Sequence, residues 1–297
     1  GEIVVNAFRF TCWGPQALRG GLLRRMNATS LLGAALFVTL FVACGVSEAQ
    51  PSTSQGSAPL TPTKPLHKGK TPSKNFADAE TLGRWITYYY SRPEPLRVAE
   101  AIRSASAQGF MKDGQNAPPF IGFIAGVISK TPAVAEPLAE QLKSLPVVDQ
   151  PMLILGIWYS TYPKATPLLE RLRKAMPEHQ GMIDHLLMNG RASLLDLPLE
   201  QGPWVLDALW GYFMATGDAE PVTRIISALP WINIRGDVSR LMVGGAARWS
   251  LISNAIQHKP VMATCKKELD SQPQEVTDVL REVISAAEKD MKEGKTQ

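Results

Sequence analysis

Cysteine is scarce in this chain, with Cys12, Cys44 and Cys265 the only three among 297 residues. Two of them lie within the first 49 residues, which we expect to be removed or lipidated, so Cys265 would have no partner in the folded part. The sequence therefore excludes a fold held by several disulfides and a zinc site built from thiolates. We expect Cys265 to be a small core residue on a helix.

Common signatures of catalytic and cofactor sites are also missing. The chain has no G-x-S-x-G, H-E-x-x-H or glycine-rich dinucleotide motif, and it has four histidines. His179, Asp184 and His185 are the only clustered metal-ligand types. The two histidines are six residues apart, which would turn them to different sides of a helix, so we expect surface residues. The sequence predicts no metal site and no cofactor.

The chain carries 31 basic and 27 acidic side chains, a formal net charge of +4. The basic excess belongs to the N-terminal region, since residues 50–74 hold four lysines and no acid. From residue 75 onward the charges nearly balance. Because nucleic-acid binders carry a basic surface, we expect no nucleic-acid partner.

An apolar segment near the N-terminus predicts export. Leu31–Ala43 is an uncharged apolar run of 13 residues, which suits a signal peptide and is short for a spanning helix, which needs about 20. Three outcomes stay open for residues 26–49: cleavage after Ala49, lipidation of Cys44 in a lipobox-like Phe41–Cys44, or retention as a membrane tether. We expect the protein in the periplasm or at the cell surface.

The segments on either side of this apolar run contain little to bury. Residues 1–25 show no sustained hydrophobic periodicity, which indicates a leader that is non-native or disordered. Residues 50–74 are rich in proline, serine, threonine and lysine, a composition typical of a disordered spacer. Order should begin at Asn75, as an N-cap, and continue to residue 292, with a frayed tail at 293–297.

Helical periodicity dominates residues 75–292, and the only short β-like runs are Val147-Val148 and Trp231–Ile234, so we expect no sheet. The best-defined unit is a hairpin of two helices, Leu206–Ala215 and Ala219–Leu229. Gly217 should end the first helix with a left-handed backbone. Asp218 should cap the second helix with its side chain.

The hairpin resembles a tetratricopeptide repeat around Gly217-Asp218, with large apolar residues at Leu206, Leu209 and Phe213. It departs from that repeat at Trp210, Val222 and Leu229, where small residues are usual. The resemblance covers about a tenth of the chain and implies antiparallel hairpins stacked as a TPR-like or HEAT-like solenoid. A compact irregular helical bundle is the alternative.

Aromatic residues are the strongest binding candidates. Several aromatic residues lie on more than one face of their helix rather than along a single face. This pattern indicates either packing on both sides of inner helices or a groove for a partner. The candidate binding residues are Trp85, Tyr88, Tyr89, Arg92, Trp158, Tyr159, Trp210, Tyr212 and Arg248.

We predict a non-enzymatic scaffold or adaptor that binds an envelope protein or peptide. One alternative is an enzyme acting on envelope polymers, with carboxylates such as Glu94, Glu100 or Asp207 in acid–base roles. Another is a carrier of apolar ligands. A pocket with two carboxylates, at least one of them buried, would favour the enzyme, and a closed apolar cavity would favour the carrier.

Overall fold

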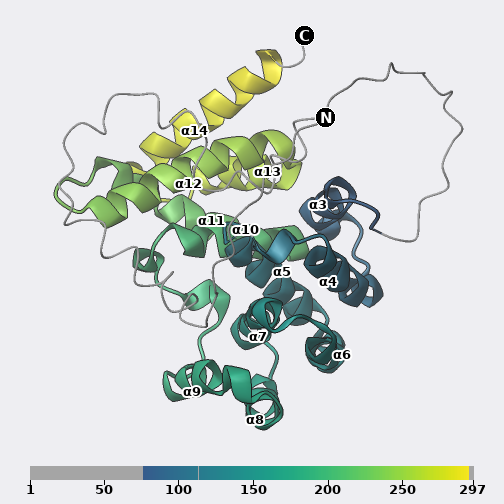
Figure 1. The fold of residues 1–297 in the computed structure, drawn as a ribbon. Helices are drawn as coiled ribbons and strands as arrows, with labels where there is room; N and C mark the ends of the chain where they lie inside the picture. The colour runs from purple at the N-terminus through teal and green to yellow at the C-terminus, as the bar shows by residue number, and fades with distance from the viewer. Residues whose placement is uncertain (1–75, 113, 294–297) are drawn as a thin grey trace, which may run out of the picture. The chain divides into compact units, whose positions relative to one another are not determined.

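The computed structural model describes residues 76–112 and 114–293, all within one compact unit (Figure 1). In this part of the chain, 12 α-helices are joined by short 3-10 turns and no strand is present. The prediction of an all-α fold is confirmed. The leader (1–25), the export segment (26–49), the spacer (50–74), Asn75 and residues 294–297 lie outside the described residues.

The first seven helices run from the start of the described chain to its middle: α3 (Ala79–Thr87), α4 (Val98–Ala107), α5 (Ala117–Lys130), α6 (Ala135–Gln141), α7 (Gln150–Tyr159), α8 (Ala165–Ala175) and α9 (Gln180–Met188). Five more complete it: α10 (Pro203–Thr216), α11 (Ala219–Ser227), α12 (Val238–Gln257), α13 (Lys259–Glu268) and α14 (Gln274–Glu293). In Figure 1, α8 and α9 lie at one end of this unit and α12–α14 at the other.

The two β-like runs form 3-10 turns. Val147–Asp149 and Leu229–Asn233 each begin just after a proline or contain one near the start, and each leads toward the next helix. Proline lacks the N–H that a strand ladder needs and fixes a turn-compatible φ, which explains the outcome. The expectation of no sheet holds for the described chain.

Helix ends follow capping chemistry at two aspartates. Asp78 Oδ1 accepts the N–H of Thr81 at 2.7 Å, so the first described helix is capped by Asp78, and the prediction of Asn75 as its N-cap is wrong. Asp237 Oδ1 accepts the N–H of Arg240 at 3.0 Å at the start of α12. Each bond satisfies a backbone donor that the helix itself leaves unpaired.

The turn between α10 and α11 confirms one prediction and corrects another. Gly217 is left-handed, with φ of 70°, and its N–H donates to Phe213 O at 2.7 Å. Asp218 stands at the N-cap position of α11, but its side chain makes no capping bond. It accepts instead from Lys130 Nζ at 2.9 Å. The predicted cap at Asp218 is therefore wrong, because a lysine on α5 takes the carboxylate.

Helices α5 and α10 form the tightest helix pair of the unit. They run parallel, since Gly122 lies against Ala208, Gly126 against Tyr212, and Lys130 binds Asp218. A Cβ at Gly122 would stand 1.8 Å from Ala208 O, and one at Gly211 would stand 1.8 Å from Pro119 O. Only glycine permits backbones this close, so these glycines set the spacing of the two helices.

The core has two apolar clusters that meet at this helix pair. One is built mainly from α3–α9 and the other mainly from α10–α14. Ala215 of α10 belongs to the first cluster and Ala125 of α5 to the second, so each helix reaches into the other half. Cys265 is fully buried in the second cluster, as predicted for a core residue.

Within the described residues, no single helix is long and apolar enough to cross a membrane. One helix pair, Ala117–Lys130 with Pro132–Ser144, is long and apolar enough to cross a membrane when the two helices are taken together. The pair is bent by 117° at the break between them.

Candidate functional site

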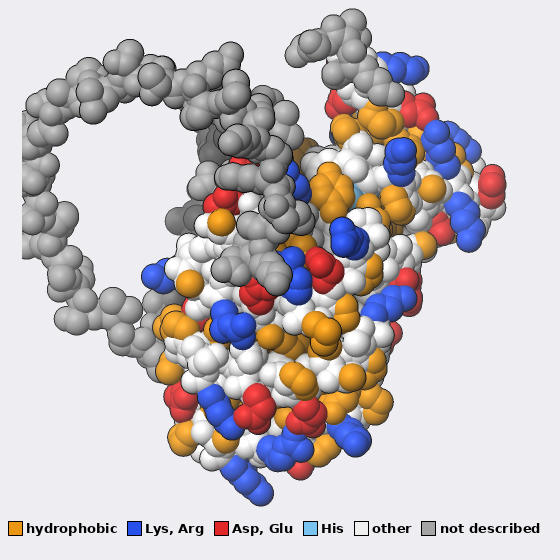
Figure 2. Space-filling model, turned by 90° about the vertical axis from the view of Figure 1, so that its right-hand side faces the viewer, with side chains coloured by type: hydrophobic (Ala, Val, Ile, Leu, Met, Phe, Trp, Pro, Cys, Tyr) orange, Lys and Arg blue, Asp and Glu red, His pale blue; other side chains and the backbone are white. Residues whose placement is uncertain are grey.

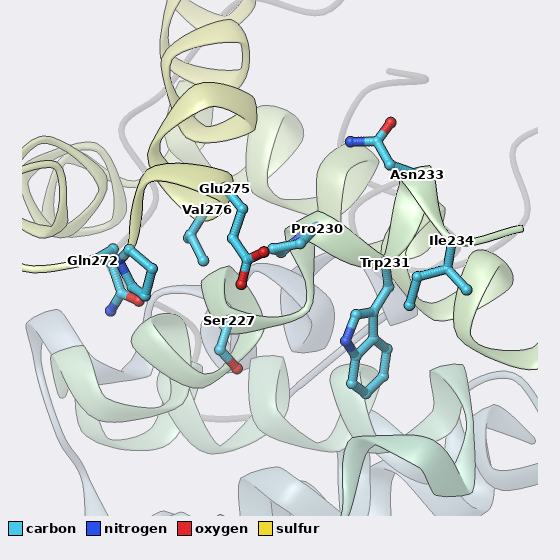
Figure 3. Close-up of a pocket in the computed structure, with 9 residues that line it drawn as sticks. Ser227, Pro230, Trp231, Asn233, Ile234, Gln272, Glu275 and Val276 are labelled. Atoms are coloured by element: carbon cyan, nitrogen blue, oxygen red, sulfur yellow. The ribbon is translucent and has the colours of Figure 1, made fainter.

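An open notch of about 470 Å³ lies between the 3-10 turn η11 (Leu229–Asn233) and the start of α14 (Figure 3). The turn supplies its aromatic wall, Trp231, and α14 supplies one carboxylate, Glu275. The lining residues are Ser227, Pro230, Trp231, Asn233, Ile234, Gln272, Pro273, Glu275 and Val276.

Trp231 is positioned by close packing of its turn on α12. A Cβ at Gly244 would lie 2.5 Å from Ile232 N and 2.7 Å from the Trp231 carbonyl carbon, so glycine is required where the turn crosses the helix. The Arg240 guanidinium lies 5.1 Å from the centre of the Trp231 ring, at cation–π distance. Arg240 also binds Glu200 at 3.1 Å, which fixes it beside the indole.

Among the described residues, Glu275 is the only charged one that lines the notch. It lies exposed in the first turn of α14, and no described residue forms an ion pair or hydrogen bond with its carboxylate. In Figure 3 this carboxylate points toward Pro230. Gln272, by contrast, donates to Glu268 at 2.6 Å, and Ser227 donates to Arg224 O at 2.7 Å. The Glu275 carboxylate is thus left available to an incoming donor.

This arrangement suits a side chain with an apolar stem and a positively charged or hydrogen-bonding head. The stem would contact Trp231, Ile234 and Val276, and the head would reach Glu275. One carboxylate in an open notch does not supply the pair that polymer hydrolysis uses. Among the residues that the structure describes, no group of three His, Cys, Asp or Glu side chains could hold a metal ion.

Four of the predicted binding residues are buried in the core: Tyr89, Trp158, Trp210 and Tyr212. Burial raises the pKa of Tyr89 to about 12 and also raises the pKa of Tyr212. These side chains pack between helices, in agreement with the packing interpretation of the aromatic pattern. Their part in binding a partner stays a prediction.

Trp85 joins α3 to its neighbours. Its Nε1 donates to Glu94 Oε2 at 2.8 Å, and its ring meets the Tyr89 ring at 5.0 Å. Tyr159 is partly buried, which raises its pKa. Arg92 is exposed, while Arg248 of α12 pairs with Glu282 of α14 at 3.8 Å. The structure therefore brings Trp85 and Tyr89 together at the N-terminal helix, whereas Arg248 lies on the α12–α14 pair.

Tyr88 is exposed and lies beside a buried histidine that the sequence analysis did not single out. Its ring centre is 5.2 Å from that of His258. His258 is fully buried between Tyr88, Tyr90 and Phe213, and burial lowers its pKa to about 4. Its Nε2 has no hydrogen-bond partner among the described residues.

The clustered metal-type residues form separate contacts. His179 is buried and shares a 2.7 Å hydrogen bond with Gln150, so the expectation of a surface position is wrong for this residue. The Nε2 of buried Gln150 donates to the backbone carbonyls of Leu142 and Leu145. Its Oε1 is therefore held in the interior, where it bonds His179. Asp184 pairs with Arg173, and His185 is exposed.

Two of the three carboxylates considered for acid–base roles are held by one arginine. Arg97 binds Glu100 at 3.1 Å and Glu94 at 3.5 Å. The third, Asp207, is buried in α10. None of the three lines the notch.

Sequence reasoning missed the notch because its residues come from a linker and a helix start. The sequence around Pro230 and Trp231 predicts a connection between helices. The sequence from Pro273 through Glu275 predicts the start of a polar helix. A tryptophan in a linker is a usable signal, since a large aromatic there must pack on something or bind something. The pairing of that linker with Glu275 is tertiary and has no local signature.

No protein-family model, no curated protein and no solved structure matches this chain.

Proposed function

We propose that this chain is an exported, non-enzymatic helical scaffold that binds a peptide segment of an envelope protein in the notch beside Trp231. The observation that carries the proposal is the pairing of a fixed indole with an unpaired carboxylate, Glu275, at an open surface. Aromatic anchors next to a polar group are typical of peptide-binding hot spots.

The preferred peptide carries lysine or arginine beside an apolar residue. Of the described lining residues only Glu275 carries a formal charge, so a cation is favoured and an anion is disfavoured. Tyr88 and Arg92, both exposed on the N-terminal turns, form a second candidate contact surface.

A TPR-like or HEAT-like arrangement of hairpins is part of this proposal. Two segments support a repeat: Ala135-Glu136-Pro137 and Ala219-Glu220-Pro221 open α6 and α11, and each is followed at equal spacing by a Leu-Pro pair, Leu145-Pro146 and Leu229-Pro230. The preceding helices of the two segments, α5 and α10, are the ones that pack in parallel. A duplicated unit would account for both facts.

A selection experiment tests the binding site. Random peptides displayed on phage are selected on the immobilised full chain, and enrichment of peptides with a basic residue beside an apolar one is expected. Glu275→Lys should abolish that enrichment because it reverses the charge of the notch. Asp290→Lys is the matched control, since Asp290 is an exposed carboxylate farther along α14. Equal enrichment by both variants, or enrichment of acidic peptides by the parent chain, would refute the site.

Export is tested separately. Metabolic labelling with a fatty-acid analogue should tag the protein if Cys44 is lipidated, and Cys44→Ala should remove the tag. An unlabelled mature protein beginning at Gln50 would establish cleavage after Ala49 instead. Intact full-length protein confined to the cytoplasm would contradict export.

A further inference from the structure

Helix α12 presents a row of apolar side chains to the outside of the described unit. The row, called the outer stripe below, consists of the exposed residues Val238, Leu241, Met242, Gly245 and Ile256, with half-buried Trp249 and Ile252 between them. Ile252 also packs against the core. Exposed fractions are 54% for Val238, 43% for Leu241, 42% for Met242 and 38% for Ile256. Steps of three and four residues keep these positions on one side of the helix for a length of about 27 Å.

The opposite side of α12 is the one that joins the core. Val243, Ala247 and Leu251 are fully buried there. A helix that is apolar on both sides is normally covered on both sides, whereas a surface helix has a polar outer face. Helix α14 has that ordinary pattern, with exposed Asp278, Arg281 and Glu282 outward and Val279 and Val283 inward. The outer stripe therefore marks a surface that something covers.

The charges near the outer stripe identify the kind of partner. Within α12, the only charged residues are Arg240 and Arg248, and both are bound to acidic groups of the unit. The two ends of the stripe are flanked by Arg235 and Lys259, which are exposed and form no ion pair with any described residue. Asp237, the acidic residue at the first end, is engaged instead by the backbone and the guanidinium of Arg240. An apolar row about 27 Å long with a free cation at each end matches a lipid surface with anionic headgroups.

We infer that α12 docks through its outer stripe onto an anionic lipid surface, with Arg235 and Lys259 contacting the headgroups. A second copy of the chain fits these charges poorly. Arg235 and Lys259 are each 12 positions from Ala247, near the middle of the stripe in the sequence, so an antiparallel two-fold pair of α12 helices would bring Arg235 of one protomer toward Lys259 of the other. A parallel pair would place each cation beside its own equivalent. Like charges meet in both cases, which disfavours self-association.

The composition of the preceding chain agrees with this occupant. The uncharged apolar segment within residues 26–49 is separated from the described unit by residues 50–75. That stretch carries Lys64, Lys68, Lys70 and Lys74 and no acid. This support rests on the export in the proposed function: a chain held at a membrane through residues 26–49 would bring these lysines to the same anionic surface. The inference does not depend on the notch at Trp231.

A fluorescent probe on α12 tests the docking directly. Gly245→Cys places an environment-sensitive nitrobenzoxadiazole label in the stripe, where a side chain meets no other atom within 4 Å. Gly181→Cys on α9 is the matched control, because it is also an exposed helical glycine with open space around it. Both are made in the full chain with Cys12 and Cys44 replaced by serine, Cys265 being buried.

Adding vesicles of phosphatidylcholine and phosphatidylglycerol should shift the Gly245 probe to the blue and leave the Gly181 probe unchanged. Phosphatidylcholine alone should give a weaker shift. Leu241→Glu should lower the vesicle partition of the α12 probe about tenfold or more, since it removes an exposed leucine that would enter the lipid and adds a negative charge. Leu96→Glu, at the exposed turn Pro95–Arg97, should not.

Three results would overturn the inference. A vesicle-bound chain whose Gly245 probe stays unshifted would mean that residues 26–49 alone bind the lipid. A blue-shifted Gly245 probe without lipid, independent of protein concentration, would mean that the chain's own N-terminal segment covers the stripe. A shift without lipid that grows with protein concentration would mean that a second copy covers it.

Discussion

Tyr90 and His258 share a hydrogen bond of 3.1 Å between the tyrosine hydroxyl and histidine Nδ1, although 168 residues separate them in the chain. The bond ties the turn after α3 to the junction of α12 and α13. Phe213 of α10 packs against both rings, at 5.2 Å from Tyr90 and 5.5 Å from His258. The first and last parts of the described unit are thereby joined through α10.

This contact predicts a loss of stability at mildly acidic pH. Burial lowers the pKa of His258 to about 4, whereas a histidine in the unfolded chain keeps its ordinary value of 6.5. The unfolded state therefore binds a proton first, and the free energy of unfolding falls as the pH drops from 6.5 toward 4. The full effect is on the order of 3 kcal/mol. Urea unfolding of the full chain at a series of pH values measures it.

His258→Phe should flatten that pH profile, and His185→Gln, a change at an exposed histidine, should leave it as it is. His179 adds a smaller effect of the same sign, because burial also lowers its pKa. Carboxylates such as Glu136 and Glu288, whose pKa values are lowered by ion pairs, contribute at more acidic pH. An unchanged slope between pH 6.5 and 5 in His258→Phe would show that His258 is not the group responsible.

The glycines between α5 and α10 predict a contrast between equivalent substitutions. Gly122→Ala should destabilise the fold by about 3 kcal/mol or more, because its Cβ would overlap Ala208 O. Gly181→Ala should be neutral or stabilise by up to about 1 kcal/mol, because alanine favours the helix and meets no neighbour there. Thermal unfolding of both variants is the measurement. Equal melting temperatures would mean that α5 and α10 are farther apart.

The all-helical fold and the α10–α11 hairpin could be predicted from the sequence because their signals are local. Apolar periodicity, prolines at helix starts and Gly217 at a helix end each act within a few residues. The pairing of α5 with α10 was not foreseen, because the residues that permit it, Gly122, Gly126 and Gly211, differ from helix-breaking glycines only in what packs on them. The Asp218 cap failed for a similar reason, since Lys130 reaches that carboxylate from another helix.

The candidate binding residues show the same difference between features with local sequence signals and features that depend on tertiary packing. Aromatic spacing marked Trp158, Trp210 and Tyr212 as important, and they are core residues. Which aromatics would face solvent depends on how helices stack, which a single sequence does not specify. Trp231 and Glu275 come together only after α11 and α14 have packed. The exposure of the apolar row on α12 could not be predicted either, because a helix with apolar residues on all sides is expected to be buried on all sides.

Limited proteolysis tests the predicted boundary of the folded part. Protease should cut residues 50–74 rapidly and leave a resistant core that begins near residue 76, because only the latter region buries apolar side chains. Mass spectrometry of the core gives its ends. A resistant fragment that begins near Gln50 would contradict the spacer assignment.

Two adjacent substitutions at the α10–α11 turn should differ in their effects. Gly217→Val should cost about 1 kcal/mol or more, because a β-branched residue fits φ of 70° poorly and its Cβ would lie 3.1 Å from the Tyr90 ring. Asp218→Ala removes an exposed ion pair with Lys130 rather than a helix cap, so its cost should stay below about 1 kcal/mol. Lys130→Ala should cost as little, and the double variant little more than either. A loss near 2 kcal/mol in Asp218→Ala that Lys130→Ala does not reproduce would restore the capping role that the structure denies to Asp218.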